Sequence, residues 1–207
     1  MLYIFNELEL LEESFCEAMM PFLSEERRLK TNRLQFPKGK NASVAAYLLL
    51  RIALDIEYGI NEAVEFEYLE KGKPVLKNYP LIHFNLSHTN SAAACVVSDQ
   101  EVGIDIQNIR SVTNGTARRV LTEAEYMEFK SASNPDEYFC YIWTIKEGYM
   151  KKTGQGIAAA FNKLPVTEIN DFMIFREKDY FCSVCGYIAS RLKIRHIGRE
   201  DFEKLCN

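Results

Sequence analysis

The chain has 207 residues, 47% of them apolar, and a formal net charge of −4 at pH 7. This length fits one large domain or two small, packed ones with a substantial core. The weakly acidic balance gives no global reason to expect nucleic acid as a partner. No apolar run approaches the length that spans a bilayer, and the chain does not begin with the pattern of a secretory signal. We therefore expect a cytoplasmic globular protein that binds neither nucleic acid nor membrane.

The first half is expected to hold two helices followed by a β meander. Ser24 can cap a helix whose first turn carries two glutamates, and Pro37 is expected to end that segment. A second helix, mostly apolar, is expected from near Asn41 to Gly59. Strand-like segments follow at about residues 64–69, 81–86 and 92–97, with turns between them.

The second half is expected to repeat this order of helices and strands. It begins with a short apolar strand that holds Asp105, followed by a polar loop over residues 110–116. Helices should start near Thr122, where Glu125 completes a capping box, and near Asn134. Strands are expected at about residues 172–175, 180–187 and 191–195. The pattern predicts an α+β fold with a packed boundary near residue 102.

Six cysteines are scattered along the chain, mostly in apolar surroundings where cysteine behaves as a small hydrophobe. Cys182 and Cys185 have the C-x-x-C spacing, but no second pair and no histidine pair accompanies them. Reduced thiols are therefore the favoured interpretation, and zinc or redox use is the minor one.

Two segments carry the chemistry: the strand that ends near Asp105, and a helix that places Glu147 and Lys151 one turn apart on one face. Their ordinary interpretation is a solvated strand end and a surface ion pair, which is worth only about 0.2–0.5 kcal/mol. Gly103, which permits a close approach, and Trp143, one turn before Glu147, favour a functional interpretation. Two carboxylates beside a lysine suit a hard cation such as Mg²⁺, or Mn²⁺ in its place, and a pyrophosphate substrate.

Phosphate contacts are indicated at two further places. Ser87 and His88 lie where a strand gives way to a loop, which suits hydrogen bonds to phosphate but also an ordinary capped turn. The basic run from Arg27 to Lys40 is either a solvated helix face or a polyphosphate site. These residues alone leave a Mg²⁺-dependent pyrophosphohydrolase open as a function.

Four motifs together resemble the 4′-phosphopantetheinyl transferase superfamily in order and spacing. They are Gly72-Lys73-Pro74, His83-Phe84-Asn85-Leu86-Ser87-His88, Gly103-Ile104-Asp105, and Trp143-x-x-Lys146-Glu147-x-x-x-Lys151-x-x-Gly154-x-Gly156. The layout is similar to the larger, surfactin-synthetase-activating class. That resemblance implies a monomeric pseudo-dimer of two α+β halves, with coenzyme A nucleotide contacts in residues 1–102 and the metal site and catalytic helix in residues 103–207.

The resemblance implies transfer of the 4′-phosphopantetheine arm of coenzyme A to a serine of an apo acyl or peptidyl carrier protein. Asp105 and Glu147 would ligate Mg²⁺, Glu147 or a metal-bound water would take the serine proton, and Lys151 would neutralise the leaving group. Gln107 stands where a third acidic ligand is common, and its neutral amide should bind the metal more weakly.

The remaining implied contacts are to coenzyme A. They are Lys73, Ser87, His88 and Lys146, and, from the less certain upstream match, Arg28, Lys30, Lys38 and Lys40. A catalytically silent homologue that binds coenzyme A or a carrier protein is the alternative from another functional class.

Overall fold

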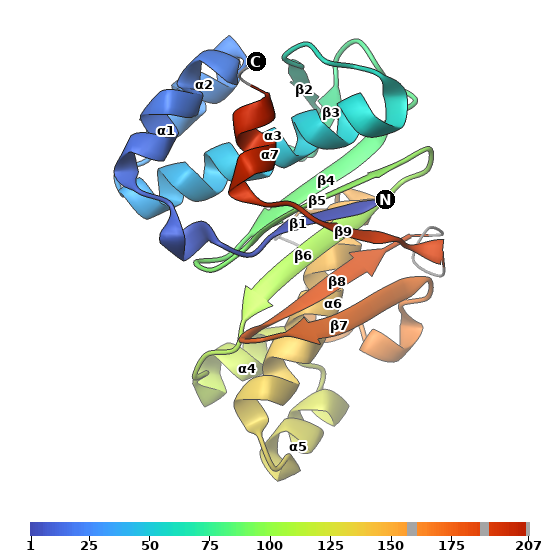
Figure 1. Ribbon diagram of the computed structural model, residues 1–207. Helices are drawn as coiled ribbons and strands as arrows, with labels where there is room; N and C mark the ends of the chain where they lie inside the picture. Colours follow the sequence, from blue (N-terminus) through green and yellow to red (C-terminus); the bar gives the residue numbers. More distant parts are fainter. Residues whose placement is uncertain (157–160, 187–190, 206–207) are drawn as a thin grey trace.

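The computed structural model describes residues 1–156, 161–186 and 191–205 (Figure 1). In chain order the strands and helices are β1 (Leu2–Phe5), α1 (Glu13–Met19), α2 (Glu25–Asn32), α3 (Pro37–Tyr58), β2 (Phe66–Tyr68), β3 (Pro74–Leu76), β4 (His83–His88), β5 (Ala93–Ser98), β6 (Gly103–Asn108), α4 (Asn114–Val120), α5 (Glu123–Ser131), α6 (Pro135–Thr153), β7 (Phe172–Glu177), β8 (Tyr180–Cys185), β9 (Ile194–His196) and α7 (Arg199–Lys204).

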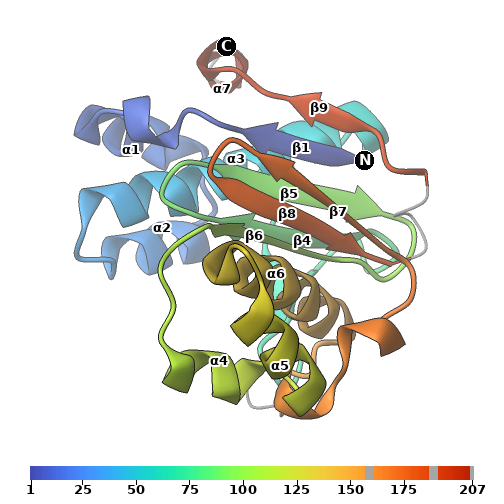
Figure 2. The same ribbon diagram turned by 90° about the horizontal axis from the view of Figure 1, so that it is seen from below.

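Strands that are apolar on both faces give the molecule its layers. In β1, Tyr3 and Phe5 belong to a core shared with the helices, whereas Leu2 and Ile4 belong to a core between two sheets. The first sheet has the order β4-β5-β1-β9 and the second the order β6-β8-β7. Figures 1 and 2 show α1, α2 and α3 on one side of this pair of sheets and α4, α5 and α6 on the other.

The expected α+β class is confirmed, and several element boundaries are corrected. Thr122 and Asn134 cap α5 and α6 as predicted. Pro37 does not end the first helix but begins α3, because proline at the first helical position loses no hydrogen bond. Strand β1 was not predicted, and β3 starts at Pro74, where only a turn was expected. Helix α4 begins inside the predicted polar loop.

The cysteines behave as small apolar residues. Five of them are buried and free, and Cys206 lies outside the described residues. Cys182 packs between the two sheets, whereas the Cys185 thiol donates to the carbonyl oxygen of Ile145 on α6 at 3.6 Å. The C-x-x-C pair therefore points to opposite faces of β8, which ends at Cys185. Tyr187, included in the predicted strand, lies outside the described residues.

The end of the chain returns to the first half. Strand β9 pairs in parallel with β1, and Phe202 on α7 is fully buried against Phe5 and Phe15, with ring centroids 4.9 Å and 5.8 Å away. A boundary near residue 102 and the pseudo-dimer stay predictions. None of the helices in the described part of the chain is long and apolar enough to cross a membrane.

Candidate active site

The two sheets meet at the site through side chains of β4. Phe84 belongs to the core under α3, and Leu86 packs against that core, so Asn85 and Ser87 point the other way, toward β6. The Asn85 Oδ1 accepts the backbone N–H of Ile104 at 3.1 Å, and the Ser87 Oγ accepts that of Ile106, also at 3.1 Å. No strand of the described chain pairs with this edge of β6. The two side chains therefore supply hydrogen-bond acceptors to backbone N–H groups that would otherwise lack them.

Helix α6 packs on β6 at very short range because Gly103 has no side chain. A Cβ there would lie 2.1 Å from the carbonyl oxygen of Gly148 and 2.3 Å from the backbone nitrogen of Lys152. The close approach predicted at Gly103 is therefore made by the backbone of α6. It brings Asp105, two residues further along β6, beside the face of α6 that carries Glu147 and Lys151.

Asp105, Ser87 and Lys151 form a connected polar cluster. The Asp105 Oδ1 accepts hydrogen bonds from the Ser87 hydroxyl at 2.9 Å and from the Lys151 ammonium at 2.7 Å. Lys151 Nζ also donates to Ser87 Oγ at 3.0 Å. The second oxygen of Asp105, Oδ2, is buried without a hydrogen-bond partner. A buried carboxylate oxygen in that state favours a cation beside it.

Glu147 supplies the second carboxylate. Its side chain is largely buried, and burial together with the nearby Asp105 raises the pKa of Glu147, while Lys151 acts in the opposite direction. Gln107 lies half-buried on the same face of β6 as Asp105, since the two residues are two positions apart. Among the described residues, no group of three or more histidine, cysteine or acidic side chains is arranged so that it could hold a metal ion. Oxygen groups of this kind, two carboxylates and an amide on the same strand face as Asp105, fit a hard cation that completes its shell with water and substrate oxygens.

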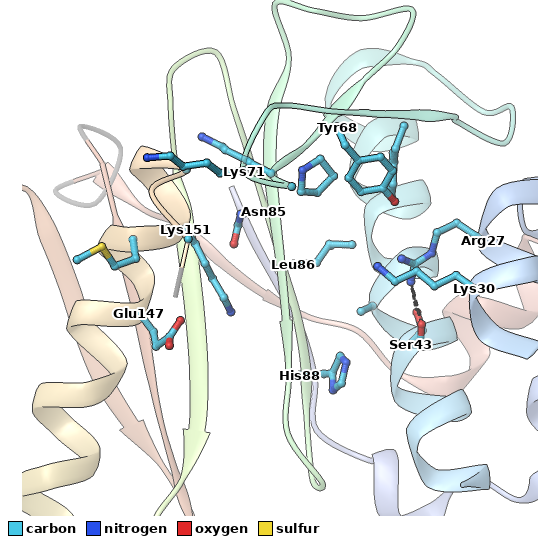
Figure 3. Close-up of a pocket in the computed structure, with 18 residues that line it drawn as sticks. Arg27, Lys30, Ser43, Tyr68, Lys71, Asn85, Leu86, His88, Glu147 and Lys151 are labelled. Atoms are coloured by element: carbon cyan, nitrogen blue, oxygen red, sulfur yellow. Dashed lines mark hydrogen bonds between the residues drawn. The ribbon is translucent and has the colours of Figure 1, made fainter. Parts of the chain in front are cut away.

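A cleft of about 350 Å³ runs from this cluster to the N-terminal helices (Figure 3). One wall carries Glu147 and Lys151 from α6, and Leu86 and His88 project from β4 between that wall and the helices. The residues that line the cleft are Arg27, Lys30, Ser43, Ala46, Phe66, Tyr68, Lys71, Gly72, Lys73, Pro74, Asn85, Leu86, His88, Glu147, Met150, Lys151, Gly154 and Gly156.

The far end of the cleft is basic. Arg27 is buried, and its Nη2 donates to the Ser43 carbonyl at 3.0 Å and to the Ser43 hydroxyl at 2.9 Å. Lys30 lies one turn further along α2, exposed to the cleft, and His88 faces these cations from β4 (Figure 3). His88 is exposed to the cleft, but partial desolvation of its ring by the cleft walls, together with the nearby cations, lowers its pKa. The basic end of the cleft therefore suits the binding of an anionic group.

Most of the predicted site residues come together. Asp105, Glu147, Lys151, Ser87, His88, Lys73 and Lys30 lie in or directly behind the cleft walls. Lys73 lines the cleft, and its ammonium donates to the carbonyl oxygen of Lys152. Ser87 itself is buried beside Asp105, not among the lining residues. Arg28, Lys38 and Lys40 are not among those residues either.

Arg27, which lines the cleft, was missed in favour of its neighbour Arg28. Ser24 caps α2, which makes Arg27 the third helical residue, and the cap therefore fixes the rotation of the helix. Arg27 faces Ser43 on α3, whereas Arg28 is exposed. The predicted cap was therefore the available signal for choosing between the two arginines.

Lys146 does not line the cleft, so the implied contact of its side chain with coenzyme A does not fit its placement. Its side chain is fully buried, and its Nζ donates to Glu125 at 2.6 Å and to the carbonyl oxygens of Val120 and Phe161, each at 3.0 Å. Neighbouring residues on a helix point about 100° apart, so Lys146 faces α5 while Glu147 faces β6. Lys146 holds the helical layer together.

Known proteins share this sequence pattern. The family model described as the 4′-phosphopantetheinyl transferase superfamily matches residues 101–186. The chain is similar to a 4′-phosphopantetheinyl transferase of Bacillus subtilis, with 30% identity over 154 residues that cover 72% of this chain and 68% of the relative. It is similar to the transferase psf-1 of Bacillus pumilus, with 34% identity over 145 residues, covering 69% of this chain and 62% of the relative. It is also similar to the transferase HetI of Nostoc sp., with 34% identity over 157 residues, 70% of this chain and 65% of the relative. The chain therefore belongs to the 4′-phosphopantetheinyl transferase superfamily and is a 4′-phosphopantetheinyl transferase.

Proposed function

We propose that the protein transfers the 4′-phosphopantetheine arm of coenzyme A to a serine of an apo acyl or peptidyl carrier protein, with Mg²⁺ as the metal. The observation that carries this proposal is the cleft, which joins a basic end to a pair of carboxylates and a lysine. Coenzyme A has a matching charge pattern, since its 3′-phosphate and its pyrophosphate are separated by a ribose. The class of relatives supports the same reaction.

The basic end is the proposed site of the 3′-phosphate. Arg27 is held rigid by its bonds to Ser43, and Lys30 and His88 face the same space (Figure 3). A phosphate there would receive charge-assisted hydrogen bonds from three directions. Lys73, which lines the cleft between this end and α6, is a second nucleotide contact. Contacts from Arg28, Lys38 and Lys40 stay predictions.

The other end is the proposed site of the pyrophosphate. Asp105 and Glu147 would hold Mg²⁺, or Mn²⁺ in its place, and Gln107 would be a third, neutral oxygen donor. The spare Oδ2 of Asp105 and the two adjacent carboxylates support this assignment. Bound there, the ion supplies neutralisation of charge on the phosphoryl oxygens.

The residues of the chain account for the proton and the leaving group. The carrier serine oxygen attacks the pyrophosphate phosphorus that bears the pantetheine arm. A new P–O bond forms, and the bond to the bridging oxygen breaks, which releases adenosine 3′,5′-bisphosphate. Glu147, whose carboxylate lies near Asp105, would accept the serine proton. Lys151, whose ammonium lies 2.7 Å from Asp105 Oδ1, would neutralise the leaving phosphate.

Intact-mass spectrometry of apo acyl and peptidyl carrier proteins, incubated with the enzyme, coenzyme A and Mg²⁺, tests this function. We expect a gain of one phosphopantetheine that is lost with chelator and with Glu147→Ala. Calorimetric binding of coenzyme A without transfer to any carrier would instead support the silent homologue. The carrier's identity, the monomeric state and the cytoplasmic location stay predictions.

A further inference from the structure

Helix α2 places an acidic residue one turn before a lysine of the basic end. Glu26 lies four residues before Lys30, so the two side chains share one face of the helix. This order, with the glutamate before the lysine, is the one that favours an ion pair between them. Lys30 lines the cleft, whereas Glu26 is not among the lining residues. A pair between the two would therefore take a cation away from the proposed phosphate site.

Glu26 has a different partner. Its Oε1 accepts a hydrogen bond from the hydroxyl of Tyr68, the last residue of β2. Within the part of the chain that the structure describes, Lys30 makes no ion pair with Glu26 or with any other carboxylate. Partial burial, together with the bond to Glu26, raises the pKa of Tyr68 to about 12, so its hydroxyl remains a donor at neutral pH.

The bond between Tyr68 and Glu26 joins two separate parts of the cleft wall. Tyr68 belongs to the two-stranded sheet of β2 and β3, and its ring lies on the same side of the cleft as Arg27 and Lys30 (Figure 3). Burial and Arg27 lower the pKa of Lys30, whereas the charge of Glu26 raises it. The charges of Glu26 and Lys30 are therefore close enough to interact even while the carboxylate is bound to Tyr68. A rotation of the Glu26 side chain would bring them together.

We propose that Tyr68 is a positioning residue for the basic end of the cleft: its hydroxyl holds the Glu26 carboxylate away from Lys30, which leaves the Lys30 ammonium available to the 3′-phosphate of coenzyme A. This inference rests on the proposed function, because it takes that phosphate as the ligand of Lys30. Without the hydroxyl, Glu26 loses its partner and can rotate toward Lys30. The carboxylate then competes with the phosphate for one ammonium and repels it at shorter range. The loss of affinity should therefore be confined to ligands that carry the 3′-phosphate.

The test is a double-mutant cycle on Tyr68→Phe and Glu26→Gln, read by calorimetric titration with coenzyme A and with 3′-dephospho-coenzyme A in chelator. Tyr68→Phe should raise the dissociation constant of coenzyme A about three- to tenfold, less than the full loss of a charged hydrogen bond. The constant of 3′-dephospho-coenzyme A should stay within about twofold. Glu26→Gln should bind coenzyme A at least as tightly as the wild type. Tyr68→Phe added to Glu26→Gln should then change that affinity by no more than about twofold.

Tyr79 offers a matched control. Its hydroxyl also donates to a glutamate, Glu62, and neither residue lines the cleft. Tyr79→Phe thus removes a bond of the same kind at a place where no lysine of the basic end can be captured. Both dissociation constants should stay within about twofold of the wild type.

Three results would overturn the inference. The first is an unchanged affinity for coenzyme A in Tyr68→Phe. The second is a loss in Tyr68→Phe that persists in the Glu26→Gln background, which would make the Tyr68 hydroxyl a direct ligand contact. The third is a wild type that binds coenzyme A and 3′-dephospho-coenzyme A equally well, which would also remove the phosphate from Lys30. A wild type that shows the expected cycle but modifies no carrier would count against the proposed transfer alone, because the role of Tyr68 concerns binding.

Discussion

Glu147 illustrates a conflict between stability and function in one side chain. Burial and the nearby Asp105 raise its pKa, so the folded protein holds the Glu147 proton more tightly than the unfolded chain does. Glu147 therefore makes its full contribution to the stability of the native state below the pKa of an unfolded glutamate, about 4.3. That contribution is lost as the pH rises through the pKa of Glu147 in the folded protein. At neutral pH without metal, the ionised carboxylate destabilises the native state.

We therefore predict that Glu147→Gln raises the melting temperature at pH 7.5 in chelator, although it removes a catalytic group. The gain should be a few degrees, since about 1 kcal/mol corresponds to about 2–4 °C in a chain of this size. Transferase activity should fall by about 10²–10⁴-fold, as expected for loss of a proton acceptor. Differential scanning fluorimetry at pH 7.5 and pH 4 checks the sign. A gain that is as large at pH 4 as at pH 7.5 would show that titration of Glu147 is not its cause.

Gln107 is the position at which the proposed metal site can be improved. It lies on the same face of β6 as Asp105 but brings no charge. Gln107→Glu should lower the Mg²⁺ concentration for half-maximal rate severalfold, because a third carboxylate increases affinity for a hard cation. Mg²⁺ titrations of the initial rate measure this change. An unchanged or higher requirement would indicate that Gln107 does not face the metal.

At the scale of elements, the contact between α6 and β6 sets the distance between the carboxylates. Gly103→Ala would place a methyl group 2.1 Å from the carbonyl oxygen of Gly148, so α6 must move away from β6. Overpacking of this kind costs about 1–3 kcal/mol, and here both clashing atoms belong to the backbone, so the cost should lie at the upper end. Activity should fall further than stability alone explains, because Asp105 and Glu147 move apart.

Gly39→Ala is the matched control for that prediction. Gly39 lies in helix α3, and a Cβ added there meets nothing within 4 Å. Replacing a helical glycine by alanine should stabilise the protein by about 0.5–1 kcal/mol. Urea denaturation and initial rates compare the two variants. If Gly103→Ala kept wild-type stability and rate, the close packing of α6 on β6 would not position the site.

Helix α6 also shows what the sequence could and could not predict. Its N-cap at Asn134 and the pair of Glu147 and Lys151 on one face follow from capping and from the 3.6-residue period. The role of Lys146 does not follow, because the period gives the angle between neighbours but not which element packs on each side. Glu125 was expected only as a capping residue, and it both caps α5 and binds Lys146.

The same limit applies to the whole molecule. Apolar alternation and turn residues predicted the α+β class and several of the strands, because these signals are local. Strand β1 and the parallel pairing of β9 with it were out of reach, since that pairing joins residues at the two ends of the chain. The cleft is equally non-local: β4 turns Leu86 and His88 toward the helices of the first half, and Asn85 and Ser87 toward β6.

The core between the two sheets predicts that the chain unfolds as one unit. Leu2, Ile4 and Val96 of the first sheet pack against Ile104 and Val184 of the second, so neither sheet can unfold without exposing the apolar face of the other. Phe202→Ala removes a fully buried ring from the core around α3 and should cost about 3–5 kcal/mol. The fluorescence of Trp143, the only tryptophan, reports on unfolding around α6, on the other side of the two sheets.

Urea transitions followed by Trp143 fluorescence and by far-ultraviolet circular dichroism should therefore coincide in the wild type and shift together in Phe202→Ala. Phe36→Ala is the control, because that ring is 75% exposed and its loss should change stability by no more than about 0.5 kcal/mol. If the Trp143 transition stayed in place while the dichroism transition moved, the two sheets would unfold independently. The cleft would then lie between two separately stable units, and its geometry would depend on how firmly they are joined by Asn85, Ser87 and the sheet-to-sheet core.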